Sequence, residues 1–89
     1  MALDVASNPF VFDAAGQEFG DKVYIVGVLV TTGVDSGEFQ LSESLGGRDI
    51  LPQRAINAEQ TVWYGELGWV RSLYLTQLPA GGEIRVFIR

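Results

Sequence analysis

The segment Lys22–Thr32 carries the strongest apolar pattern in the chain. It reads KVYIVGVLVTT, and its centre, Tyr24–Val30, contains no charged side chain and no side-chain amide. A run of β-branched and aromatic residues bounded by turn residues predicts a β-strand. A strand with one wet face alternates apolar and polar residues, and this segment does not alternate. The pattern therefore predicts a strand that is covered on both faces.

Shorter apolar segments, separated by glycine-rich turns, follow along the rest of the chain. We expect strands, some of them bent, at 9–12, 22–32, 38–42, 49–51, 61–67, 69–78 and 83–89, with a loop at 13–21. Pro52 is expected to shorten the strand before it or to place that strand at a sheet edge. The segment 53–60 has room for one irregular helical turn. Turn signals about every ten residues are typical of an all-β sandwich or barrel.

These elements predict a single all-β domain over residues 1–89. We expect a small antiparallel β-sandwich of about seven or eight short strands. Residues 1–8 show no periodicity and are expected to form an extended N-terminal arm. No segment is long enough to supply a helix that covers a sheet face, so the outer face of the central strand needs another cover.

Strand parity decides which side chains of Tyr24–Val30 face away from the core. If Ile25 and Leu29 face inward, the outer face carries the even-numbered residues Tyr24, Val26, Val28 and Val30, and the reverse assignment is equally open. The outer face of this strand is covered either by a segment of the same chain, which is the N-terminal arm or 53–60, or by another subunit. We take the four even-numbered residues as candidate protein–protein contacts.

Three aromatic residues form a second candidate contact. Trp63, Tyr64 and Trp69 lie close together in the sequence, and Trp and Tyr are favoured at protein interfaces. Trp63 and Tyr64 are adjacent, so they point to opposite faces of one strand and one of them is expected in the core. Core packing, a protein interface and a sugar-binding platform remain open for this cluster. We include it, together with Phe10, among the candidate interface residues.

Composition and charge narrow the class of partner. The chain has six Lys and Arg residues, 11 Asp and Glu residues and a formal net charge of -5. Because phosphate binding needs clustered basic residues, nucleic acid is not an expected partner. The charged fraction is only 19%, below the usual quarter or so, which favours a surface partly covered by other subunits. Residues 1–10 resemble no signal peptide, and no apolar run reaches bilayer-spanning length, so we expect synthesis in a cytoplasm and no membrane contact.

The sequence offers little catalytic chemistry. It contains no His and no Cys, which removes the commonest general base, metal ligand and thiol nucleophile. Asp35 and Glu38, or Glu59 and Glu66, could meet across a turn, but acidic residues beside turns are typically solvated. The segment 33–38 (GVDSGE) lacks the number and spacing of oxygen ligands in a calcium loop. We therefore expect no enzymatic activity, no metal and no cofactor.

Three segments together resemble a class of very small proteins of tailed bacteriophages. They are NPFVFDAAGQEF (8–19), DKVYIVGVLV (21–30) and LYLTQLPAGGEIRVFIR (73–89). The class is similar in its opening Asn-Pro strand and loop, its Lys-Val strand with an internal glycine, and its closing glycine-turned hairpin. The segment 52–68 departs from this pattern, and we expect specific contacts there.

The resemblance implies an architecture and a structural role. It implies a first strand and turn over 8–16, a central strand over 22–30 and a last hairpin over 78–88, with no catalytic residue. It also implies a virion component, most simply a capsid decoration or cement protein on the capsid exterior. The expected partners are the major capsid protein, further copies of the chain in a dimer or trimer, or both. The alternatives are a neck, tail or fibre-attachment protein, or a carbohydrate-binding module.

Overall fold

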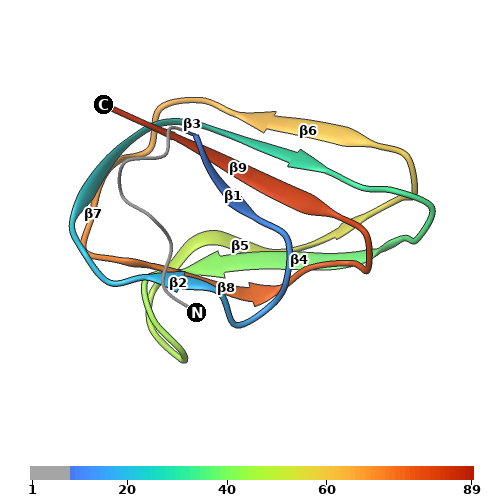
Figure 1. The fold of residues 1–89 in the computed structure, drawn as a ribbon, viewed down its shortest axis with the longest axis horizontal. Helices are drawn as coiled ribbons and strands as arrows, with labels where there is room; N and C mark the ends of the chain where they lie inside the picture. The colour runs from blue at the N-terminus through green and yellow to red at the C-terminus, as the bar shows by residue number, and fades with distance from the viewer. Residues whose placement is uncertain (1–8) are drawn as a thin grey trace.

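Two antiparallel β-sheets pack face to face in residues 9–89, the part of the chain that the computed structural model describes (Figure 1). The first sheet has the order β1 (Phe10–Phe12), β9 (Glu83–Ile88), β3 (Val23–Thr31), β6 (Thr61–Tyr64), and β7 (Gly68–Val70) also pairs with β3. The second sheet has the order β2 (Glu18–Phe19), β8 (Leu73–Gln77), β4 (Gly37–Ser42), β5 (Asp49–Ile56). The expected all-β sandwich is confirmed. The expected arm, 1–8, lies outside the described residues.

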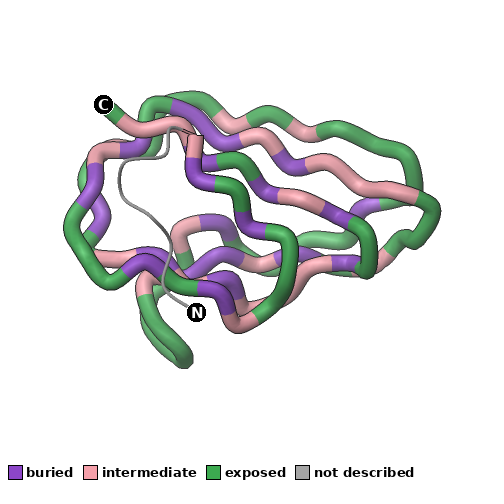
Figure 2. Tube along the Cα trace, viewed as in Figure 1, coloured by how far each residue is buried: buried purple, intermediate pink, exposed green. Residues whose placement is uncertain are grey.

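The core lies between the sheets and is built from the inward side chains of both. Its fully buried members include Phe10, Phe12, Ile25, Val28, Val30, Ile84 and Val86 from the first sheet and Phe39, Leu41, Leu51, Leu73 and Leu75 from the second. Figure 2 shows buried positions recurring along the strands of both layers. Each such side chain contributes about 1.5–3 kcal/mol by leaving water.

A β-bulge in β3 decides which of its residues face outward. Against β9, Ile25 pairs with Ile88 whereas Gly27 pairs with Phe87, so Val26 is an extra residue in the ladder. A bulge of this kind interrupts the two-residue alternation of side chains. The core-facing positions of β3 therefore have odd numbers before the bulge, as at Ile25, and even numbers beyond it.

The central strand was expected to turn either all its even-numbered or all its odd-numbered residues outward. Neither assignment is right, because the bulge shifts the alternation within the strand. Val28 and Val30 are both 0% exposed and belong to the core. Val26 remains on the outside at 38% exposed, and Tyr24 is half-buried there. Phe10 is also a core residue, at 1% exposed. Phe10, Val28 and Val30 therefore do not present their side chains for contact with a partner.

The main differences from the expected strands lie in three places, and residues 9–89 contain nine strands rather than seven or eight. Residues 18–19, expected in a loop, form β2 against β8. β5 continues through Pro52 to Ile56 and replaces the helical turn considered for 53–60. Among the described strands β5 pairs only with β4, and such an edge position tolerates a residue without an N–H group. The segment 61–78 divides into β6, β7 and β8.

Candidate functional site

The outward surface of the first sheet gathers large apolar side chains. Cross-strand pairing places Leu29 beside Trp63, Tyr24 beside Trp69, and Gly27 beside Phe87, and directly paired residues share one face of a sheet. We call this surface the outer aromatic face and define it as Tyr24, Val26, Leu29, Trp63, Trp69 and Phe87. Trp63 and Trp69 are 57% and 58% exposed. The described residues contain no helix that could cover them.

At one end of the outer aromatic face, the Trp63 indole lies on the backbone of Gly27. A Cβ atom added at Gly27 would lie 2.6 Å from Trp63 Cζ2 and closer still to Cη2, which is inside contact distance. The ring centroids of Trp63 and Phe87 are 5.9 Å apart, within the usual range for aromatic pairs. Because Gly27 has no side chain, the Trp63 indole can pack directly on its backbone.

At the other end, Tyr24 and Trp69 meet edge to face, with ring centroids 5.4 Å apart. The Arg89 guanidinium lies 3.9 Å from the Tyr24 ring centroid. The Tyr24 hydroxyl donates a hydrogen bond to the Glu66 carboxylate. This bond to Glu66, followed by desolvation, raises the pKa of Tyr24 above its ordinary value. Both indoles thus sit in fixed surroundings, although more than half of each is exposed.

Tyr64 lies on the inner side of β6, opposite to its neighbour Trp63. Its ring meets Phe39 edge to face at a centroid distance of 6.2 Å, and it packs against the core. Arg54 donates a hydrogen bond of 3.3 Å to the Tyr64 hydroxyl. The expectation that Trp63 and Tyr64 divide between surface and core is confirmed, and Tyr64 is the core partner.

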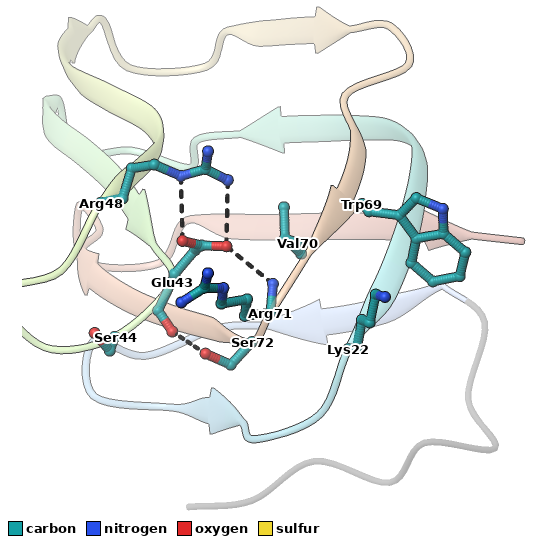
Figure 3. Close-up of a pocket in the computed structure, with 8 residues that line it drawn as sticks. All are labelled: Lys22, Glu43, Ser44, Arg48, Trp69, Val70, Arg71 and Ser72. Carbon is teal, nitrogen blue, oxygen red and sulfur yellow. Dashed lines mark hydrogen bonds and ion pairs between the residues drawn. The ribbon is translucent and has the colours of Figure 1, made fainter.

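A pocket of about 640 Å³ adjoins Trp69 (Figure 3), and most of the residues that line it are polar or charged. It is lined by Lys22, Glu43, Ser44, Arg48, Trp69, Val70, Arg71 and Ser72. Lys22 directly precedes β3, Trp69 and Val70 belong to β7, and the other lining residues come from the β4–β5 and β7–β8 connections. Trp69 therefore belongs both to the outer aromatic face and to the wall of this pocket.

Glu43 organises the pocket through contacts with two of the arginines. Its carboxylate accepts hydrogen bonds from Arg48 Nη2 at 3.2 Å and from the Arg71 backbone N–H at 2.9 Å, and it lies 3.1 Å from Arg48 Nε. Its backbone carbonyl accepts a hydrogen bond from the Ser72 hydroxyl. The Arg71 backbone bond, aided by the charges of Arg48 and Arg71, holds the pKa of Glu43 below its ordinary value of 4.5. The carboxylate is thus ionised and fixed across the pocket.

Within residues 9–89, no group of three or more His, Cys, Asp or Glu side chains is placed to hold a metal ion. No helix among these residues has the length and apolarity to span a membrane.

Comparison of the chain with protein-family models, with curated proteins and with solved structures found no match.

Sequence reasoning identified part of the outer aromatic face and missed the rest. Tyr24, Val26, Trp63 and Trp69 were expected contacts and do lie on this face. Phe87 was missed as a member, although its alternation with buried Val86 and Ile84 signals an outward position. The pocket was also missed, because Lys22, Arg48 and Arg71 are far apart in the sequence and carry no common motif.

Proposed function

We propose that the chain is a non-enzymatic structural subunit that docks onto a protein assembly through the outer aromatic face. The observation that carries this proposal is the pair Trp63 and Trp69, each more than half exposed and each packed in fixed surroundings. Rigid aromatic side chains lose little conformational entropy on binding, and they dominate many interfaces. An apolar face of this kind, left uncovered by residues 9–89, marks an interaction site on a small domain.

We take the identity of the assembly from the resemblance of the sequence to very small proteins of tailed bacteriophages. The assembly is the capsid of such a phage, and the chain is an exterior decoration or cement protein. The docked partner is the major capsid protein, and neighbouring copies of the chain contribute further contacts. An aromatic side chain buries about 150–250 Å² in an interface, and covering the exposed half of one indole is worth roughly 2–3 kcal/mol. Weak individual contacts suffice where many copies dock and linked copies bind with avidity.

The test is co-sedimentation of the purified protein with capsids, comparing wild type with Trp63→Ala. The loss of roughly 2–3 kcal/mol predicts a Kd raised by about 30-fold or more. Val34→Ala is the matched control, because Val34 is 82% exposed and lies in the β3–β4 connection, outside the outer aromatic face. The control is expected to bind like wild type. Binding by Trp63→Ala at wild-type strength would remove the outer aromatic face from the docking surface.

A carbohydrate-binding module is the second candidate, and the two exposed indoles on one sheet face favour it specifically. Sugars stack on exposed, rigid aromatic rings, as these two are. The same two variants separate the candidates when they are applied to a glycan array. A protein that binds glycans through Trp63 and does not sediment with capsids is a carbohydrate-binding module. A neck, tail or fibre-attachment protein would dock on particles too, but in far fewer copies.

A further inference from the structure

The pocket beside Trp69 concentrates positive charge in an acidic protein. Lys22, Arg48 and Arg71 line it, which is three of the six Lys and Arg residues in a chain of net charge -5. Among residues 9–89, Glu43 is the one carboxylate in the lining. The described side chains, three cations against one anion, thus give the pocket two formal positive charges. Such a local reversal of the overall charge attracts an anionic group.

Within the described residues, two of the three cationic side chains form no ion pair with a carboxylate. Arg48 is paired with Glu43. The Arg71 backbone N–H, rather than its guanidinium, bonds to Glu43. The Lys22 ammonium lies 4.9 Å from the centroid of the Trp69 ring. Over residues 9–89 the ion pairs are Arg48–Glu43 and Arg85–Glu83. The Arg71 charge acts on Glu43 without forming an ion pair with it, so the Arg71 guanidinium and the Lys22 ammonium can each still pair with an incoming carboxylate.

We propose that this pocket receives a carboxylate side chain from an acidic peptide segment of the protein on which the outer aromatic face docks. The inference rests on the proposed function, because Trp69 joins the pocket to that face. The partner segment would place an Asp or Glu side chain between Lys22 and Arg71. Its neighbouring apolar residues would cover Trp69. Figure 3 shows Lys22 beside the Trp69 ring and Arg71 beside Glu43.

A carboxylate suits the pocket better than a phosphate does. Glu43 is held ionised by its hydrogen bonds in the pocket lining, and it repels a dianion more strongly than a monoanion. A phosphate site is also commonly built from a nest of backbone N–H groups. Here the Arg71 N–H, on the pocket wall, already donates to Glu43.

Trp69 provides a direct readout of binding. The chain has two tryptophans, so a Trp63→Phe variant leaves Trp69, in the pocket wall, as the single indole. Titration of this variant with a hexaglutamate peptide at low salt is expected to change the Trp69 emission saturably. The change should weaken as salt is added, since exposed charges are screened.

Substitutions in the same background locate the binding. Arg71→Gln and Lys22→Gln each remove one exposed charge contact and should raise the Kd for hexaglutamate by about two- to fivefold. Arg54→Gln is the control, with the same change of charge on β5, outside the pocket lining. It should leave the Kd within error of the parent, since a charge outside the pocket makes no contact with the peptide.

Three results would overturn the inference: no saturable response to hexaglutamate, an equal loss of affinity in Arg54→Gln, or inorganic phosphate binding as tightly as the peptide. The capsid assay separates this inference from the proposed function. If hexaglutamate does not bind while Trp63→Ala loses capsid docking, the carboxylate site is wrong and the docking face stands. If Arg71→Gln weakens peptide binding while Trp63→Ala docks normally, the pocket binds acidic peptides but the proposed docking face is wrong.

Discussion

Val26 and Val28 give a matched pair of truncations that tests how β3 is oriented. In a regular strand, residues two apart face the same side and respond alike to truncation. Because of the bulge, Val28 is fully buried whereas Val26 is 38% exposed on the outer aromatic face. Truncating either valine to alanine removes the same two methyl groups, so any difference reports their surroundings.

The expected magnitudes differ clearly. For Val28→Ala, two buried methyl groups at about 0.8 kcal/mol each, plus a cavity term, lower the free energy of unfolding by about 2 kcal/mol. For Val26→Ala the site is partly exposed and leaves no enclosed cavity, so the loss is below about 1 kcal/mol. In a domain of this size, 1 kcal/mol shifts Tm by about 4–8 °C.

The assay is thermal unfolding followed by circular dichroism, with urea unfolding as a check that the slope of the transition is unchanged. Val28→Ala should lower Tm by about 8–16 °C and Val26→Ala by much less. Equal shifts, or a larger shift for Val26→Ala, would refute the bulged register. The assignment of Val26 to the outer aromatic face would fall with it.

Three further predictions concern single positions. Gly27→Ala should displace the Trp63 indole into solvent without unfolding the domain. In a Trp69→Phe background this displacement should appear as a red shift of Trp63 emission, and an unchanged spectrum would contradict the packing of Trp63 on Gly27. Val28→Lys, which buries a charge in the core, should abolish cooperative unfolding in circular dichroism, and a stable folded variant would contradict the placement of Val28. Glu43 has a depressed folded-state pKa, so its contribution to stability is present above about pH 4.5 and is lost as the pH falls through the folded pKa. Glu43→Gln should therefore be less stable than wild type near neutral pH in urea unfolding, with the difference shrinking in acid; a constant difference would contradict this linkage.

The sandwich itself could be predicted from the sequence because local signals agree with the fold. Glycine and proline turns separate short β-branched segments, and no segment has the period of a long helix. The alternation in 83–89 puts Ile84 and Val86 on one face of a strand, and both are buried in the core. The sequence did not predict the strand that forms only through pairing with another strand. β2 is two residues long and exists through its pairing with β8, so no local pattern marks it.

The site was harder to predict because it depends on one backbone irregularity and on distant segments. Apart from its glycine, nothing in YIVGVLV points to a bulge, and only the pairing with β9 identifies Val26 as the extra residue. Gly27 gave the single local hint, since a glycine within a strand often marks a bulge or a close approach. The pocket brings together Lys22, Glu43 and Arg71 by the packing of three connections, which sequence spacing does not show.

The proposed function makes the chain a docked structural subunit of a phage particle. Its most direct test is quantitative mass spectrometry of purified virions of the phage whose genome carries the coding sequence, with copies counted against the major capsid protein. We expect a copy number comparable to that of the major capsid protein, and release of the chain when Trp63 is replaced by Ala. A copy number that fits one ring of subunits would identify a neck or tail component instead. Absence of the chain from the virions would contradict the proposed function.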